Sequence, residues 1–442
     1  MLFYIAILLA SYAVIVLTMM IMKPKEHQID RQKHAIVLVL GDLGHSPRMS
    51  FHAQSIAKCD WKVSLVGYNE SEISETIKSS SNIQVSYLAT PQPRKGMFLI
   101  WAVKRVVAQH LELWSVLSRL PEADILLVQN PPSIPTLGVA RLFTLFKGGK
   151  LIIDWHNLGY SILACKTKSK VAVRLYKMYE ALFGRIAYLH LSVSIRLGMA
   201  LRTGMGVNPK RIIPLYDRPL KSYAVSLEKA FSLRHESFDS LINSPSDKWI
   251  VTSTSYTPDE DLDMLLDALE LYDKDPSRKH TLNLIVTGKG PLKDSFLEKA
   301  AASKYKFVSI QTVWLSYEKY HELLSVCDIG ISMHKSSSGW DLPMKVVDMF
   351  GAGLPVLALG FPALDELVKD RKNGIVFKNA SGLSRSLLEA TNNLELYRTL
   401  KAGALDESKN TWGSQWETKL GPIFGQGLYP QADDSSSSSD ED

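Results

Sequence analysis

The chain has 442 residues, of which 46% are apolar and 22% charged, and its formal net charge is +6. These fractions are typical of a globular protein, and the length exceeds what one hydrophobic core usually supports. The modest charge argues against a nucleic-acid binder, and three widely spaced cysteines exclude a disulfide framework and match no metal-ligand spacing. We therefore expect two domains of ordinary size in a reducing compartment.

The first segment is apolar and uncharged from Leu2 to Met22, which is long enough to cross a bilayer as one helix. No Lys or Arg precedes it, whereas Lys23 and Lys25 follow it, so it does not resemble a cleaved signal peptide. We expect an uncleaved anchor and basic segment over residues 1–33. The cations after the helix predict a lumenal N-terminus and a cytosolic remainder.

Short apolar runs of strand length then alternate with segments long enough for helices. This alternation predicts an α/β protein with two doubly wound, Rossmann-like parallel sheets. The expected strands lie at residues 34–40, 62–67, 125–129, 151–154 and 189–193, and then at 249–252, 282–286, 307–311, 329–333 and 356–359. The expected divisions are a first domain at 34–215, a linker and loop at 216–248, a second domain at 249–395, a helical segment at 396–428 and a disordered acidic, Ser-rich tail at 429–442.

The first expected strand ends in a glycine-containing loop, Gly41-Asp42-Leu43-Gly44-His45. Ligands of open α/β sheets bind beyond the carboxyl ends of the strands. Gly41 and Gly44 let the backbone approach a ligand, and His45 accepts a proton near neutral pH, which makes it a candidate base. The alternative is a tight turn with an incidental histidine.

A second cluster, Asp154-Trp155-His156-Asn157, follows the strand at 151–154. Polar groups at a strand end are costly to bury without partners, so this pattern favours a site over a core.

In the second domain, Ser336, Ser337, Ser338 and Gly339 precede a helix that Pro343 is expected to open. An N-terminal helix end with Lys345 in its first turn suits a phosphate-like anion. Lys345 and Asp348 should share a face, where a cation and a carboxylate would hold the diphosphate and hydroxyls of a nucleotide sugar. The alternative is a buried helix whose Lys345 and Asp348 pair in solvent. Asp341 is expected to cap this helix.

Other polar groups end neighbouring strands of this domain. Hydroxyls and glycine N–H groups suit phosphate contacts, and a lysine adds charge, although an ordinary turn explains the glycines nearly as well. These residues are Ser253, Thr254, Gly288, Lys289 and His334.

One stretch of the first domain, residues 91–107, mixes cations such as Arg105 with bulky apolar groups such as Trp101. Such a mixture is typical of a helix at a membrane interface, with core packing as the alternative.

Two motifs carry a resemblance to a known family. They are P-x-K-V-x-D-x-x-x-A-G-x-P-V at 343–356 and T-G-K-G-P at 287–291. Both resemble the donor-binding half of GT-B glycosyltransferases. With the blocks G-D-L-G-H-S-P-R-M and I-D-W-H-N-L-G-Y-S, the chain resembles the dolichol-pathway β-mannosyltransferases from about residue 35 to 377.

That resemblance implies inverting transfer of mannose from GDP-mannose to dolichyl diphosphate chitobiose, with a β-1,4 linkage, at the cytosolic face of the endoplasmic reticulum. The product would carry the first mannose of the lipid-linked oligosaccharide for N-glycosylation. The implied partners are the membrane and other mannosyltransferases of the pathway. No tightly bound cofactor and no metal ligands are expected, and stimulation by a divalent cation is left open.

The resemblance also implies roles for the candidate residues. A lipid-linked N-acetylglucosaminyltransferase of bacterial peptidoglycan synthesis has a similarly placed histidine, which makes His45 the first candidate base, with His156 or Asp154 next. The acceptor would be bound by residues of the first domain, namely Gly41, Gly44, Trp155 and Asn157. The donor would be bound by residues of the second domain, namely Ser253, Thr254, Gly288, Lys289, His334, Ser336, Ser337, Ser338, Gly339, Lys345 and Asp348.

The chain departs from many retaining GT-B relatives, which carry an Arg and a Lys after the first strand of the donor domain. Here Ser253, Thr254 and Ser255 are followed by Asp259 and Glu260. Two alternatives to the transferase remain, a catalytically silent scaffold for other glycosyltransferases and a nucleotide-sugar epimerase.

Overall fold

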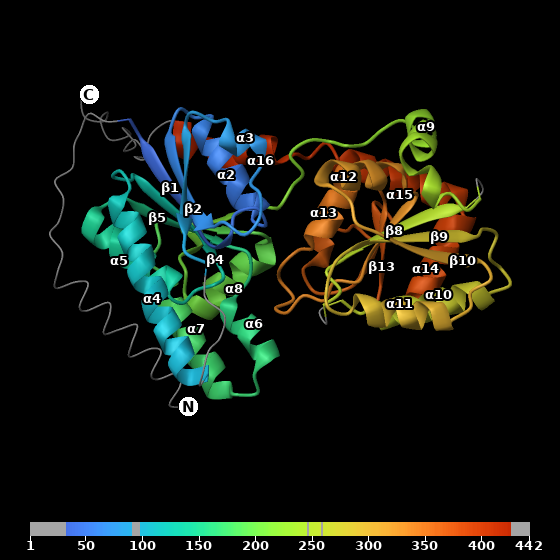
Figure 1. Cartoon of the computed structure of the whole chain (residues 1–442), viewed down its shortest axis with the longest axis horizontal. Coiled ribbons are helices and arrows are strands. Elements are labelled where there is room, and N and C mark those ends of the chain that lie inside the picture. The colour runs from blue at the N-terminus through green and yellow to red at the C-terminus, as the bar shows by residue number, and fades with distance from the viewer. Residues whose placement is uncertain (1–31, 91–97, 245–246, 258–259, 426–442) are drawn as a thin grey trace, which may run out of the picture. The chain divides into compact units, whose positions relative to one another are not determined.

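The computed structural model describes residues 32–90, 98–244, 247–257 and 260–425 (Figure 1). The anchor expected over Leu2–Met22 and the tail at 429–442 lie outside these residues. Within the described part, no helix combines the length and apolarity needed to cross a membrane.

The first sheet has seven strands in the order β3-β2-β1-β4-β5-β6-β7. All five strands expected from apolar runs are present. The two that were missed lie at the sheet edges: β3 has one fully buried residue among six, and β7 has three residues. The strands are β1 (His34–Asp42), β2 (Lys62–Tyr68), β3 (Ile83–Leu88), β4 (Ile125–Asn130), β5 (Lys150–Trp155), β6 (Leu189–Ser192) and β7 (Ile212–Pro214).

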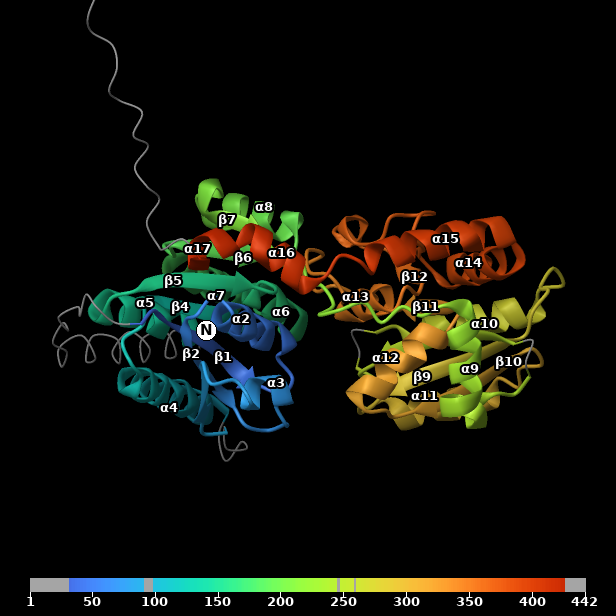
Figure 2. The same ribbon diagram turned by 90° about the horizontal axis from the view of Figure 1, so that it is seen from above.

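Parallel pairing aligns the carboxyl ends of these strands. β1 lies inside the sheet, with Ala35 opposite Val63 of β2 on one side and Ile125 of β4 on the other. The helices that connect the strands lie on both faces (Figure 2). They are α2 (Pro47–Ala57), α3 (Glu75–Lys78), α4 (Phe98–Arg119), α5 (Thr136–Lys147), α6 (Gly159–Lys166), α7 (Lys170–Gly184) and α8 (Ile195–Met205).

The stretch at 91–107 is helical where the structure describes it, since α4 begins at Phe98. Its contact with a bilayer stays a prediction.

The second sheet has six parallel strands in the order β10-β9-β8-β11-β12-β13. Alternate residues of β8 enter different cores, Ile250 on one face and Trp249 and Val251 on the other, as expected for a strand buried on both sides. The strands are β8 (Lys248–Thr254), β9 (Leu282–Gly288), β10 (Val308–Val313), β11 (Ile329–Ser332), β12 (Val356–Leu359) and the missed β13 (Gly374–Phe377).

Helices cover both faces of this sheet (Figures 1 and 2). They are α10 (Leu262–Lys274), α11 (Lys293–Ala302), α12 (Tyr317–Val326), α13 (Met344–Gly351), α14 (Ala380–Asn392) and α15 (Leu394–Glu407).

The stretch expected as linker and loop, 216–248, contains the helix α9 (Leu227–Phe238). Phe238 and Leu241 are buried in a core cluster of the second sheet, so much of this stretch belongs to that domain. The helix was not predicted, because the sequence of this stretch is polar and only weakly periodic.

The last two helices that the structure describes pack against α2 and Trp61 of the first domain. These are α16 (Trp412–Lys419) and α17 (Gly421–Gly425), which fall in the same compact unit as β1, β2 and β3. The Trp416 indole donates to Nδ1 of His52 at 3.2 Å, and the Trp61 indole donates to the carbonyl of Phe424 at 2.8 Å.

Candidate active site

The loop after β1 holds a histidine against a carboxylate. Nδ1 of His45 lies 2.5 Å from Oδ2 of Asp42 and 2.9 Å from the Ser71 hydroxyl. The other carboxylate oxygen of Asp42 accepts the backbone N–H groups of Glu70 and Ser71, both at 3.0 Å. Burial acts to raise the pKa of Asp42, but the hydrogen bonds from His45, Ser71 and these amides hold it well below its ordinary value. Asp42 therefore stays ionised near neutral pH.

This arrangement leaves the far side of the His45 ring available. The side chain of His45 is 80% exposed, while that of Asp42 is 9% exposed. Because the carboxylate meets Nδ1, Nε2 is the nitrogen that can take a proton from a substrate. Asp42 therefore holds the His45 ring in one orientation, through a contact that was not predicted from the sequence.

Gly44 has a steric reason to be glycine. A Cβ there would lie 2.7 Å from Cβ of Ser71 and 2.8 Å from the carbonyl oxygen of Glu72. The close approach brings the loop after β2 to His45. At Gly41 a Cβ would meet only Val39 at 3.4 Å, so packing does not explain that glycine.

The loop after β5 forms a second histidine–carboxylate pair. Nε2 of His156 lies 3.0 Å from Oδ2 of Asp154; the histidine side chain is 27% exposed and the carboxylate is fully buried. Asp154 is therefore placed to orient His156, and its burial argues against a role as the base itself.

Trp155 does not lie where an acceptor contact was expected. Its side chain is fully buried and its indole donates to Nδ1 of His190 at 3.1 Å. A Cβ at Gly184 would lie 2.9 Å from the indole ring, so Trp155 packs tightly in the core. The expectation of acceptor contact is wrong for this side chain, because residues alternate in direction along a strand end.

Asn157 stabilises its own loop. Its amide oxygen accepts the backbone N–H of Leu158 at 2.7 Å and the Ser161 hydroxyl at 3.3 Å.

The buried carboxylate of Glu180 accepts hydrogen bonds from the segment that follows Asn157. Glu180 accepts the backbone N–H of Gly159 at 2.8 Å and of Tyr160 at 3.2 Å, at the start of α6. The Ser133 hydroxyl, at 2.6 Å, and the Asn130 amide, at 3.2 Å, complete its hydrogen bonds. Burial nevertheless raises the pKa of Glu180. The carboxylate stands at a helix N-terminus, where a negative charge is favoured.

In the second domain, α13 begins after Pro343, as expected, and ends at Gly351. Among the described residues no side chain caps its N-terminus. Asp341, expected as the cap, instead accepts the Ser336 hydroxyl and lies 3.3 Å from Nε2 of His334. These two contacts hold the pKa of Asp341 below its ordinary value even though burial acts to raise it.

Lys345 and Asp348 do not pair with each other. Lys345 forms an ion pair with Glu260, whose side chain is 2% exposed. Glu260 also accepts the Thr254 hydroxyl at 2.5 Å and the Ser255 N–H at 2.8 Å. The buried Glu260 carboxylate thus neutralises the lysine that was expected to bind phosphate.

Asp348 belongs to a separate polar chain. The Tyr320 hydroxyl lies 2.9 Å from that of Ser253 and 3.5 Å from Oδ2 of Asp348. Burial, together with the charge of Asp217, raises the pKa of Asp348 to about 7, although the Tyr320 hydrogen bond acts against this. The carboxyl is therefore poised to gain or lose a proton near neutral pH.

The serine loop before α13 is folded on itself. The Ser336 hydroxyl accepts the N–H of Gly339 at 2.7 Å, and the Ser338 hydroxyl accepts the N–H of Trp340 at 3.1 Å. Gly339 has a φ of +80°, which favours glycine. Ser337 lies in the same turn.

The T-G-K-G-P turn brings two loops together. A Cβ at Gly288 would lie 1.7 Å from the carbonyl oxygen of Thr254, and one at Gly290 would lie 1.7 Å from that of Ser255. Both glycines are therefore needed for packing, whatever their ligand contacts. Nζ of Lys289 lies 4.2 Å from the ring centre of Trp314, whose side chain is exposed.

No group of three or more His, Cys, Asp or Glu side chains suited to a metal ion occurs among the described residues. The contacts that were not predicted from the sequence are those of Asp42, Glu260 and Tyr320. Asp42 contacts His45 from within the same loop. Glu260 and Tyr320 reach α13 from other parts of the second domain.

Comparisons with known proteins agree on the class of protein. Residues 247–394 match the family model described as "Glycosyl transferases group 1". A chitobiosyldiphosphodolichol beta-mannosyltransferase from Yarrowia lipolytica is 42% identical, over 94% of this chain and 92% of its own length. A protein from Arabidopsis thaliana named UDP-glycosyltransferase TURAN is 33% identical, over 91% of this chain and 99% of its own.

A solved structure shows the fold. The sucrose-phosphate synthase of Thermosynechococcus elongatus superposes with a TM-score of 0.66 at 14% identity, covering 90% of this chain and 99% of that one. The two parallel sheets are thus those of a GT-B fold, and the chain is a glycosyltransferase that belongs to the family of the chitobiosyldiphosphodolichol beta-mannosyltransferases.

Proposed function

We propose that the protein transfers mannose from GDP-mannose to dolichyl diphosphate chitobiose with inversion, forming a β-1,4 linkage. The observation that carries this proposal is the 42% identity to a β-mannosyltransferase over nearly the whole chain. The relatives' names support the lipid-linked chitobiose acceptor.

His45 acts as the base in this proposal. Its Nε2 removes the proton of the acceptor hydroxyl as that oxygen attacks the anomeric carbon and the bond to GDP breaks. The ionised Asp42, held by the amides of Glu70 and Ser71, stabilises the imidazolium that forms. Gly41 and Gly44 allow the acceptor close to the loop. His156, oriented by Asp154, and Asn157 are proposed to position the acceptor sugars.

The diphosphate binds at the N-terminus of α13, where backbone N–H groups and Lys345 favour an anion. Lys345 first has to exchange its Glu260 partner for the diphosphate. Glu260 keeps its contacts to Thr254 and Ser255 when that happens, so the buried carboxylate is not left without donors.

The remaining donor contacts come from neighbouring loops. Asp348, with Tyr320 and Ser253 behind it, accepts hydroxyl groups of the nucleotide sugar. Additional donor contacts are assigned to Thr254, Gly288, Lys289, His334, Ser336, Ser337, Ser338 and Gly339.

The protein is proposed to act at the endoplasmic reticulum, anchored by residues 1–33, with both domains on the cytosolic side. Other mannosyltransferases of the pathway are proposed partners. No resident metal or cofactor enters the mechanism.

A second donor has specific support. One relative at 33% identity is named a UDP-glycosyltransferase, so a UDP-sugar is the alternative donor.

The test incubates the full chain in detergent with labelled GDP-mannose and phytanyl or dolichyl diphosphate chitobiose. The expected product releases its label with β-mannosidase and keeps it with α-mannosidase. Label transferred only from a UDP-sugar would favour the second donor. Donor turnover without lipid acceptor would identify an epimerase, and failure to bind GDP at all would identify a silent scaffold.

A further inference from the structure

Helix α7 exposes an apolar stripe. Val171, Met178 and Leu182 recur at spacings of seven and four residues, which places them on one face of the helix. Met178 and Leu182 are 59% and 61% exposed, and Val171 and the nearby Ile186 are 47% and 46% exposed. Single exposed apolar residues are common, but four bulky ones in one row are not.

This stripe is not a misplaced core face. The same helix buries Glu180 and Gly184 on the side opposite the stripe, and Ala172 and Tyr179 on a flank about a quarter turn from it. The Tyr179 hydroxyl donates to the carbonyl of Pro135 at 3.3 Å, so that flank is fixed to the domain. The buried side of α7 is therefore already packed on the domain, and no part of the chain that the structure describes covers the apolar stripe.

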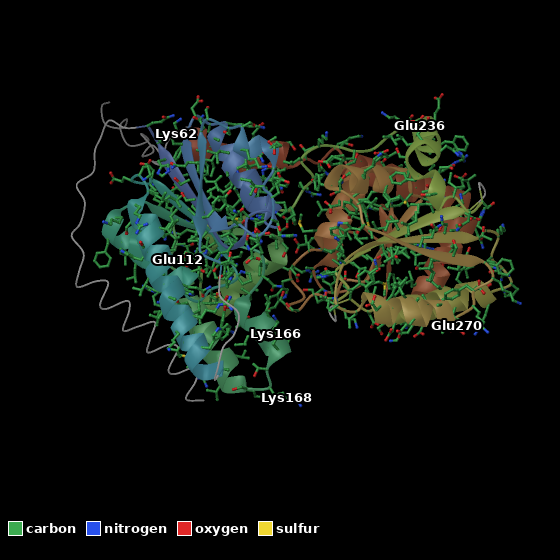
Figure 3. The ribbon with its side chains drawn as sticks, viewed as in Figure 1. Lys62, Glu112, Lys166, Lys168, Glu236 and Glu270 are labelled. Carbon is green, nitrogen blue, oxygen red and sulfur yellow. The ribbon has the colours of Figure 1, made fainter. Side chains whose placement is uncertain are left out.

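Cations surround the stripe. Lys170 and Arg174 lie beside it on α7, and Lys166 and Lys168 are exposed in the turn from α6 (Figure 3). Arg185, also exposed, caps the C-terminal end of α7. The one acidic residue between positions 159 and 186 is Glu180. It belongs to α7, and its buried carboxylate faces the first residues of α6. The exposed surface of this hairpin thus carries positive charge alone.

We propose that this surface, the exposed face of α7 with the α6–α7 turn, docks on a bilayer that contains anionic lipids. Apolar side chains enter the interface while Lys and Arg meet the headgroup phosphates, as in interfacial helices. The positive charge without exposed acid selects this partner over a protein groove of mixed charge. The inference deepens the proposed function, since a dolichyl acceptor is presented by a lipid surface. It differs from the contact expected at residues 91–107.

The test places a polarity-sensitive nitrobenzoxadiazole dye on the full chain. Met178→Cys and Leu182→Cys are labelled in a background with Cys59→Ser and Cys165→Ser, while the buried Cys327 remains. Leu271→Cys is the control, because Leu271 is an exposed apolar residue of α10, 45% exposed, away from this surface. The protein is reconstituted into vesicles of phosphatidylcholine alone or with phosphatidylserine.

We expect a blue shift at positions 178 and 182 in vesicles with phosphatidylserine and none at position 271. The triple variant Lys168→Glu, Lys170→Glu, Arg174→Glu should abolish that shift without changing the melting temperature, because all three side chains are exposed. Equal emission at all three positions would overturn the proposal. So would an equal shift in phosphatidylcholine alone, or a concentration-dependent shift without vesicles, which would indicate a second copy of the chain.

Transfer kinetics provide a second readout. In vesicles, the charge-reversed variant should lose roughly tenfold or more in kcat/KM for the lipid acceptor, with an unchanged KM for the donor. The dye measurement needs no turnover, so a blue shift without any mannose transfer would refute the proposed function and leave the docking surface standing.

Discussion

Two loops of the first domain pair a histidine with a carboxylate, and the pairs differ in how they present the ring. After β1, Asp42 meets Nδ1 of a histidine that is 80% exposed. After β5, the fully buried Asp154 meets Nε2 of a histidine that is 27% exposed. The first pair leaves the outer nitrogen open to a substrate, whereas the second occupies it. This difference supports the proposal that the loop after β1 transfers the proton and that the loop after β5 positions the acceptor.

The largest effect should come from His45→Ala. Loss of a general base typically costs ~10²–10⁴-fold in rate, so kcat should fall by that factor with little change in either KM. His156→Ala is the matched control and should cost less than about tenfold. The measurement is steady-state transfer from labelled GDP-mannose, and equal losses in the two variants would remove the distinction between the loops.

A third pair of opposite charges, Lys345 with the buried Glu260, extends the comparison to the second domain. Lys345→Ala should raise the KM for GDP-mannose roughly tenfold or more, since one charge-assisted contact to the diphosphate is lost. It should also destabilise the protein by about 3 kcal/mol, because Glu260 is left without its cation.

The double variant Lys345→Met, Glu260→Gln separates these two effects. It should recover most of the stability in a denaturant titration and keep the high KM. A recovered KM would show that Lys345 serves the fold alone.

Asp42→Asn sharpens the assignment within the first loop. The amide oxygen can still accept the N–H groups of Glu70 and Ser71, but the charge beside the imidazolium is lost. We expect kcat to fall roughly tenfold to a hundredfold, less than for His45→Ala. A variant that matches wild type in kcat would argue against Asp42 as a positioning residue.

The smallest effect concerns the pH dependence of stability. The pKa of Asp348 is raised from 3.8 to about 7, so the native state binds this proton more tightly than the unfolded chain. Stability contributed by this group therefore falls as pH rises between those two values. Asp348→Asn should flatten this slope and stabilise the protein above pH 7 by on the order of 1 kcal/mol. Thermal unfolding at several pH values checks it, and an unchanged slope would contradict the raised pKa.

The fold was predictable where burial is complete. The apolar residues of strands such as β1 and β12 form continuous runs, because both faces of an inner parallel strand are covered. The edge strand β3 was missed because only one of its six residues, Leu88, is fully buried. Helix α9 was missed because only a few of its side chains reach the core.

The site was predictable as a set of loops but not as a set of contacts. Strand ends located His45 and His156, and an expected helix N-terminus located Lys345. Their hydrogen-bond and ion-pair partners depend on how turns and neighbouring strands bring side chains together. Glu260, for example, lies far from Lys345 in the sequence but forms an ion pair with it. Likewise, a buried Trp155 beside a half-exposed His156 follows from alternation at a strand end that polarity alone does not reveal.

Chemical rescue tests the central assignment most directly. Imidazole is added to His45→Ala and, in parallel, to His156→Ala, and mannose transfer to the lipid acceptor is measured against its concentration. We predict that the rate of His45→Ala rises in proportion to neutral imidazole and that His156→Ala does not respond. Rescue of His156→Ala alone would contradict the account and place the base after β5.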